Sequence, residues 1–159
     1  MAVDYFLKID GVDGESFDSK HKSEIELASF SWGVNQSGIP SHGGGGGAGK
    51  VEFQDFHFTA RTSKASPKLF LACASGQHVR SALLTCRRAG GDQVEFLKYK
   101  LSDVLVSSFQ IAGSEASEVF DQVSLNFSKV EMEFVPIART GKAEGPARAG
   151  WDLKANKKV

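Results

Sequence analysis

The chain has 159 residues and a mass of 17.1 kDa, and its 19 lysine and arginine residues balance 19 aspartate and glutamate residues. This length predicts one domain that buries about 69% of the extended chain's surface without disulfide bonds or metal ions. The hydrophobic share of 41% and the charged share of 24% exclude a disordered, collagen-like or membrane-spanning chain, and the balanced charge argues against a nucleic-acid binder.

The first residues predict a strand and no secretory leader. Polar and apolar side chains alternate over residues 3–9, and turn-forming residues follow at 10–14. Asp4 and Lys8 interrupt the stretch that a signal peptide would need as its apolar centre. We therefore expect a protein that reaches the outside, if at all, by a machine that moves folded cargo.

Three later stretches predict long strands whose alternation slips by one residue: 24–36, 51–58 and 123–134. Such a slip indicates a β-bulge, placed near Ala28 and Ser29 in the first stretch, and bulged strands bend as barrel strands do. Two further strands are expected over 79–88 and 94–108, joined by a hairpin in which Gly90 and Gly91 adopt positive φ.

One short helix is predicted between these strands. Ser66 is the expected N-cap, Pro67 the first helical residue and Gly76 the terminator. After Pro136 the composition changes, so we expect an irregular C-terminal tail over 136–159 with Trp151 as its anchor. The fold expected is mainly β, a β-barrel or two-sheet sandwich with one short α-helix, in a single domain over 1–159.

A glycine-rich loop over 38–50 is the most conspicuous local feature. Gly44 to Lys50 nearly matches the phosphate-binding P-loop, but Val51 stands where serine or threonine would bind Mg²⁺, and a strand follows where a helix is required. Loops of this length in compact domains are usually functional. One use is an extended arm that becomes ordered only against a neighbouring subunit.

Catalytic and metal-binding constellations are not predicted. Cys73 and His78 lie near one another across a helix end without an orienting acid, and Asp55 with His57 supplies only two metal ligands on one strand face. Cys73 and Cys86 form no paired motif, which favours a reducing compartment. We therefore expect no enzyme activity, no cofactor and no metal site.

The strand-rich composition favours self-assembly. Long strands leave sheet edges that must be closed or covered, and head-to-tail contacts between copies generate rings or filaments.

Short motifs in a fixed order extend along nearly the whole chain. Ser31-Trp32-Gly33 and Arg88-Ala89-Gly90-Gly91 are examples. The segments are, in chain order, 1–9, 14–16, 31–33, 36–38, 43–50, 54–55, 66–67, 72–73, 75–76, 88–91, 104–108, 123–127 and 150–151. In this order they resemble Hcp, the haemolysin-coregulated protein family that forms the inner tube of bacterial type VI secretion systems.

This resemblance implies a structural protein that forms homohexameric rings, stacked head to tail into a hollow tube. It further implies expulsion by a contractile sheath together with the VgrG spike, and small effector proteins carried and stabilised in the lumen. The expected location is cytoplasmic before firing and extracellular afterwards, without a signal peptide and without membrane insertion.

The resemblance also implies roles for individual residues. The loop residues assigned to ring stacking are Ser41, His42, Gly43, Gly44, Gly45, Gly46, Gly47 and Lys50. Ser107, Ser108 and Ser114 fall in a region that the family places near the lumen, so they are candidates for effector contact. Two alternatives stay open: a stand-alone secreted effector, and a nucleotide-binding enzyme that uses Gly44 to Lys50.

Overall fold

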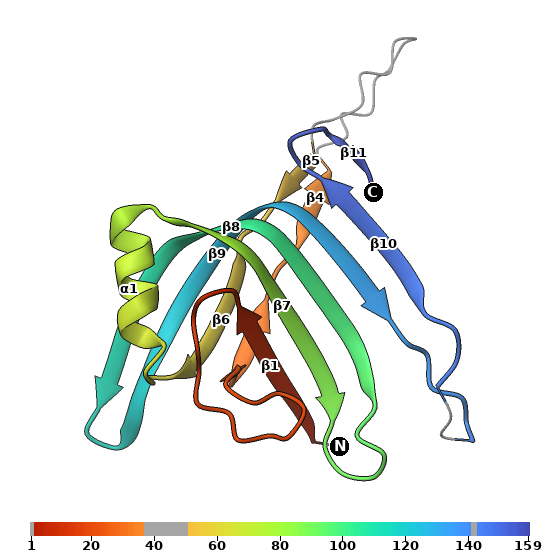
Figure 1. The fold of residues 1–159 in the computed structure, drawn as a ribbon, viewed down its shortest axis with the longest axis horizontal. Helices are drawn as coiled ribbons and strands as arrows, with labels where there is room; N and C mark the ends of the chain where they lie inside the picture. Colours follow the sequence, from red (N-terminus) through yellow and green to blue (C-terminus); the bar gives the residue numbers. More distant parts are fainter. Residues whose placement is uncertain (1, 37–50, 141–142) are drawn as a thin grey trace.

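The computed structural model describes residues 2–36, 51–140 and 143–159. These residues form one short helix and strands in two sheets (Figure 1). The elements are β1 (Val3–Ile9), β2 (Ile25–Glu26), β3 (Ser29–Ser31), β4 (Val34–Gln36), β5 (Val51–Phe53), β6 (Phe56–Arg61), α1 (Ser66–Ser75), β7 (His78–Arg88), β8 (Glu95–Ser114), β9 (Ser117–Phe134), β10 (Ala147–Asp152) and β11 (Lys157–Lys158).

The β8–β9 hairpin forms the centre of the larger sheet. Its 20-residue and 18-residue strands pair from Leu97 with Phe134 to Ser114 with Ser117. β7 and β1 extend the sheet beyond β8. On the other side of β9, β6 pairs with its first half and β10 with its second half, so two strands share one long edge. All these neighbours are antiparallel.

The sheet is not a closed barrel. β2 pairs with β1, whereas β3 pairs with β6, so the chain changes partner between Glu26 and Ser29. Two backbone hydrogen bonds mark the change: the Leu27 amide donates to Tyr5 at 2.9 Å and the Ala28 amide donates to Thr59 at 2.8 Å. The expected bulge near Ala28 is therefore wrong, because this phase slip comes from a change of partner strand.

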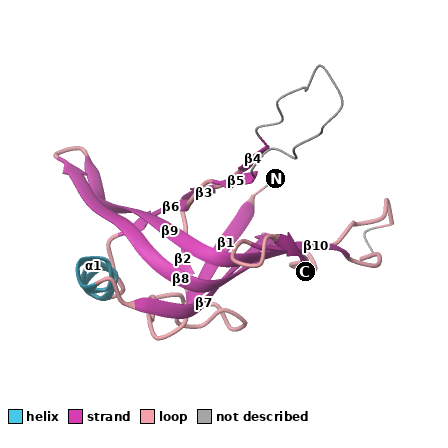
Figure 2. Ribbon diagram, turned by 90° about the horizontal axis from the view of Figure 1, so that it is seen from above, coloured by secondary structure: helices cyan, strands magenta, loops and turns pink. Residues whose placement is uncertain are grey.

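The register of the long hairpin shifts twice: an extra residue lies in β9 near the turn, opposite Gly113, and another lies in the middle of β8. The register is continuous from Phe127 to Val130, where the alternation slips. Val106 pairs with Leu125 and Ser108 with Ser124, which leaves Ser107 as the extra residue. Extra residues of this kind bend a strand and increase its twist. Seen from above, β8 and β9 curve between β6 on one side and β7 on the other (Figure 2).

Helix α1 lies where it was expected, but its cap differs. Ala65 occupies the N-cap position without a side-chain cap, and Ser66 is inside the helix. The Ser66 hydroxyl instead donates to the buried Asp121 on β9, so predicting it as the N-cap was wrong. Gly76 does end the helix at φ 68°, a left-handed conformation that glycine adopts without strain.

The turn between β7 and β8 confirms the hairpin prediction. Gly90 and Gly91 have φ values of 85° and 58°. The strands it joins are longer than expected, since β7 begins at His78 and β8 continues to Ser114.

The C-terminal residues are not wholly irregular, contrary to expectation. β10 pairs with β9 from Ala147 with Phe134 to Asp152 with Lys129, and β11 pairs with β10. Trp151 packs against the hydrophobic core and so acts as the expected anchor. The alternation that identifies a strand is weak in this segment because its residues are exposed or only half-buried.

The core fills the space between the curved sheet and its turns. Its most deeply buried side chains include Leu7, Phe56, Leu84, Val104 and Leu125. Aromatic rings join this core to the smaller β4–β5 sheet: Trp32 stacks parallel to Phe53 at 6.4 Å and meets Tyr99 edge-on at 5.2 Å.

The buried Asp121 links β9 to α1 and to the loop before it by hydrogen bonds, so its removal should destabilise the fold. Its carboxylate is 2% exposed and accepts hydrogen bonds from Thr62 Oγ1 at 2.8 Å and from Ser66 Oγ. We expect Asp121→Ala to lower the free energy of unfolding by about 2 kcal/mol, because the buried Ser66 hydroxyl still accepts from the Ser63 amide but has no acceptor for its own proton. Urea denaturation at low protein concentration measures this, with the exposed Asp13→Ala as a matched control. Equal midpoints for the two variants would contradict the assignment.

Candidate functional site

A four-stranded part of the large sheet has two very different faces. It consists of β3, β6, the first half of β9 and the second half of β8, in that order across the sheet. The inner face carries core residues such as Phe56, Phe58, Val123 and Leu125. Near the β8–β9 turn, the bond between Ser66 and Asp121 holds α1 against this inner face.

The outer face carries two rows of polar side chains. Residues directly paired across antiparallel strands point to the same face. One row is Ser31, His57, Ser124 and Ser108, and the next row is Ser29, Thr59, Gln122 and Gln110. We call these eight residues the polar plaque.

The polar plaque lacks formally charged side chains, and most of its members are exposed, whereas Ser124 is buried. Six of its members, on β6, β8 and β9, line a shallow hollow of about 350 Å³. Within the plaque, His57 Nδ1 and Ser124 Oγ are 2.5 Å apart. None of the eight residues is an acid, a lysine or an arginine.

Two charged side chains at the border of the polar plaque are already engaged in contacts. At one end, Asp55 accepts hydrogen bonds from Ser107 Oγ at 2.6 Å and from Asn126 Nδ2 at 3.0 Å. At the other end, Arg61 Nε lies 3.0 Å from Glu118 Oε2. The plaque is therefore a neutral surface that can donate and accept hydrogen bonds.

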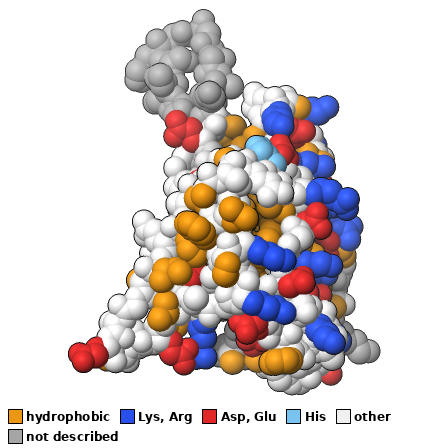
Figure 3. All heavy atoms as spheres, turned by 60° about the vertical axis from the view of Figure 1, so that its left-hand side comes forward, with side chains coloured by type: hydrophobic (Ala, Val, Ile, Leu, Met, Phe, Trp, Pro, Cys, Tyr) orange, Lys and Arg blue, Asp and Glu red, His pale blue; other side chains and the backbone are white. Residues whose placement is uncertain are grey.

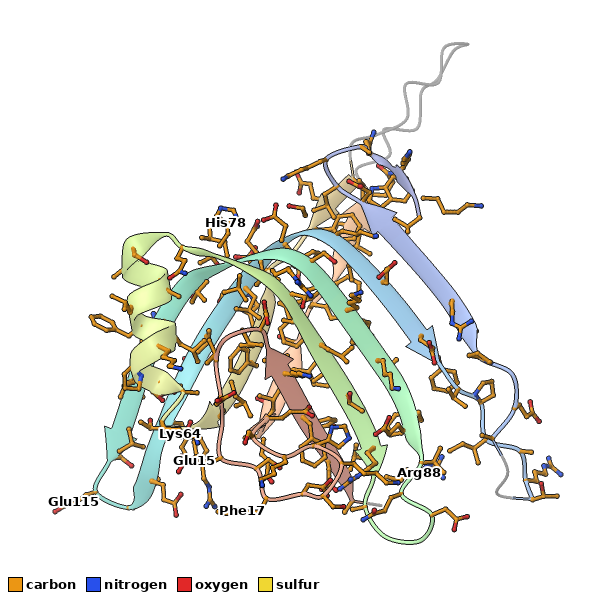
Figure 4. The ribbon with its side chains drawn as sticks, viewed as in Figure 1. Glu15, Phe17, Lys64, His78, Arg88 and Glu115 are labelled. Atoms are coloured by element: carbon orange, nitrogen blue, oxygen red, sulfur yellow. The ribbon has the colours of Figure 1, made fainter. Side chains whose placement is uncertain are left out.

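The three serines predicted to contact effectors lie at different places in the structure. Ser108 belongs to the polar plaque, and Ser107 lies at its border in the bond to Asp55. Ser114 lies at the tip of the β8–β9 hairpin, where its hydroxyl is 2.8 Å from that of Ser117. Figure 4 shows this tip, labelled at Glu115, at the end of the molecule away from His78.

Sequence reasoning gave no site role to six plaque residues, namely Ser29, Ser31, Thr59, Gln110, Gln122 and Ser124. Alternation indicates that each faces away from the core, but only the pairing of distant strands places them in rows. The bond between His57 and Ser124 spans 67 positions in the sequence.

The ring-stacking candidates Ser41, His42, Gly43, Gly44, Gly45, Gly46, Gly47 and Lys50 lie outside the described residues. The strands on either side of them are described: β4 and β5 pair from Val34 with Phe53 to Gln36 with Val51. Val51 begins a strand and not a helix, which removes the structural context that a P-loop requires.

Two edges of the four-stranded part have no strand partner among the described residues. β3 pairs only with β6. β7 pairs with β8 no further than Leu105, so the β8 edge from Val106 onward faces no other strand in the described part of the chain. Free edges present unpaired backbone groups that can pair with another chain.

An apolar patch lies beside the free edge of β8. Phe70 and Leu71 on α1 and Ile111 on β8 are 59%, 61% and 53% exposed. The Phe70 ring is 6.2 Å from that of Phe109 on β8. With α1 turned toward the viewer, Figure 3 shows hydrophobic side chains gathered on this side of the molecule.

A buried ionic cluster holds the loop between β1 and β2. Arg87, 3% exposed, donates to Asp18 at 2.7 Å and to Asp4 at 3.1 Å and lies over the Phe6 ring. These hydrogen bonds hold the pKa of Asp18 well below its usual range.

His21 closes the same loop onto the start of β8. Its ring nitrogens lie 2.9 Å from Glu24 and 2.8 Å from Glu95. Burial raises the pKa of Glu95, but hydrogen bonds from His21 and Lys98 outweigh it and lower the pKa. We regard this cluster as structural because its carboxylates are paired with Arg87 and His21, although the buried Arg87 Nε has no hydrogen-bond partner among the described residues.

No group of three potential metal ligands is placed to hold an ion within residues 2–36, 51–140 and 143–159. The helix in this part of the chain is too short to cross a membrane. Cys86 is buried, and burial raises its pKa to about 12, so its thiol stays protonated.

Comparisons with known proteins identify the family. Residues 6–134 match the family model described as "Type VI secretion system effector, Hcp". The chain belongs to the Hcp family. It is 46% identical to protein hcp1 of Pseudomonas aeruginosa over 159 residues, covering 98% of each chain.

Solved structures agree with this assignment. The structure described as a type six secretion system protein has a TM-score of 0.93 and 34% identity, covering 99% of this chain and 100% of the other. Hcp1 from Salmonella typhimurium has a TM-score of 0.83 and 39% identity, covering 100% of both. The protein is thus a secreted structural protein of type VI secretion, and the predicted β-rich Hcp fold is confirmed.

The Arg87–Asp18 contact predicts a pH dependence of stability. Because the folded-state pKa of Asp18 is lowered, its contribution is present above the unfolded-state pKa of about 4 and is lost as the pH falls toward the folded-state value. We expect Asp18→Asn to have a lower urea midpoint than the parent chain at pH 7, with a gap that narrows below about pH 4. A gap that stays constant down to pH 3 would contradict this.

Proposed function

We propose that this Hcp protein is a tube subunit whose copies join through the free edges of β3 and β8. The carrying observation is that one four-stranded segment has a core-covered inner face, a polar outer face and two free edges. Repeating such a segment side by side around an axis satisfies both edges at once, as a closed heterologous ring does. Six copies form the ring, and the polar plaque faces its lumen.

The apolar patch supports the same contact. Phe70, Leu71 and Ile111 lie beside the β8 edge, where a second copy that pairs with this edge would cover them. Large apolar patches rimmed by polar residues are typical of protein interfaces. The occupant we propose for the patch is therefore the next subunit of the ring.

Rings stack head to tail through the glycine-rich loop in this proposal. Its support is the β4–β5 pair, which the Trp32 and Phe53 rings attach to the core. The stacking residues we propose are Ser41, His42, Gly43, Gly44, Gly45, Gly46, Gly47 and Lys50.

The partners follow from this role. We propose a contractile sheath around the tube, the VgrG spike at its tip and small effector proteins in its lumen, near Ser107, Ser108 and Ser114. The tube assembles in the cytoplasm and is then expelled. The role is structural, with the sheath supplying the energy.

Two other functions make different predictions. A nucleotide-binding enzyme that used Gly44 to Lys50 would be stabilised against heat by nucleotide. A stand-alone effector would act as a monomer. The strand that begins at Val51 weighs against the first, and the free edges weigh against the second.

The test is the native mass of the full chain, by light scattering on a gel-filtration peak and negative-stain microscopy of that peak. We expect a discrete ring of about six 17.1 kDa subunits. Ile111→Lys should shift the mass toward the monomer, because it places an unpaired charge in the proposed contact.

Val159→Lys is the matched control, because Val159 is also 53% exposed but lies in a groove on the far part of the sheet, beside Gly150. This variant should keep the parent mass. A monomer at every concentration of the parent chain, or equal effects of the two lysines, would overturn the proposal.

A further inference from the structure

The side chains of the polar plaque determine which chemical groups of a partner can bind to it. We infer that this surface takes a protein partner through uncharged hydrogen-bonding groups, namely backbone amides and serine, threonine, asparagine or glutamine side chains, and that it disfavours charged segments. This inference rests on the proposed function, because that function turns the plaque toward the lumen.

The polar plaque offers no formally charged partner to a docking group. A charged group that docks on the plaque loses water and finds no carboxylate, lysine or arginine among the eight residues. The charges at the two ends of β6 are no substitute: Asp55, just before this strand, already accepts from Ser107 and Asn126, and Arg61 already pairs with Glu118. An uncharged polar group loses far less on desolvation and regains hydrogen bonds.

The side chains of the polar plaque include both hydrogen-bond donors and acceptors. Each glutamine amide both donates and accepts, and each hydroxyl can do either. Gln110 and Gln122 are exposed and directly paired, with the exposed Ser29 in the same row. Such a row matches any surface of backbone or amide groups and does not require one sequence.

The dimensions of the polar plaque fit a short peptide segment. Four strands spaced about 4.8 Å apart span about 14 Å, and the two rows are about 7 Å apart. This area accommodates a short extended segment lying across the strands. Contacts of this kind are weak singly, and repetition of the plaque around a ring raises the overall affinity without any new contact.

The probes are three fluorescent peptides of equal length, used with the full-length assembled chain. One is built from serine, glutamine, asparagine and glycine, and in the other two glutamate or lysine replaces the glutamines. Fluorescence anisotropy gives each Kd at low and high salt, about 0.05 and 0.5 M NaCl.

We expect the neutral peptide to bind at least about fivefold more tightly than either charged peptide, with a Kd that changes less than about twofold with salt. The double variant Gln110→Glu, Gln122→Glu should weaken the neutral peptide about tenfold and strengthen the lysine peptide, because it adds two charges to the plaque at constant size.

Gln77→Glu is the matched control, since Gln77 is exposed in the turn after α1 and outside the plaque. It should leave all three Kd values unchanged. Tighter binding of a charged peptide, binding of none, or equal effects of the plaque and control variants would overturn the inference.

The native mass separates this outcome from the proposed function. A ring-sized particle that prefers a charged peptide would overturn the inference and leave the proposed function standing. A monomeric parent chain sinks the proposed function, and the peptide preference of that monomer still decides the chemistry of the plaque.

Discussion

The pairing of β8 with β9 is the constraint on which the rest of this structure depends. Because both strands are unusually long, no single neighbour covers them: β6 and β10 divide one edge of β9, and β7 stops half-way along β8. The uncovered half of β8 is therefore a direct consequence of strand length. So is the separate four-stranded segment that carries the polar plaque.

The same pairing divides the chemistry of the molecule between two faces. The bulge at Ser107 bends β8, and α1 is held on the inner side through Asp121. Apolar residues then point inward and toward α1, while serine, threonine, glutamine and histidine occupy the outer rows. A structural role in type VI secretion is consistent with this division, because it combines a stable core with unpaired strand edges and a neutral outer surface.

Local signals in the sequence predicted much of the fold. Alternation located most strands, Pro67 and Gly76 marked the helix, and Gly90-Gly91 marked the hairpin, since each effect acts within a few residues. The strand change between β2 and β3, the weakly patterned β10 and the role of Ser66 were missed because each depends on distant partners. The Ser66–Asp121 bond spans 55 positions. The candidate site follows the same rule: Ser107 and Ser108 were found through family resemblance, whereas the rows that define the polar plaque require the register of four strands.

Hydrogen–deuterium exchange on the assembled particle tests the central claim most directly. The account predicts that alternate amides of residues 29–31 and 106–112 exchange slowly in the assembled parent chain and rapidly in the Ile111→Lys monomer, because a second copy pairs with these edges. Amides in the β8–β9 ladder should be protected in both. Equally rapid exchange at both free edges in the assembled particle and in the monomer would contradict the account.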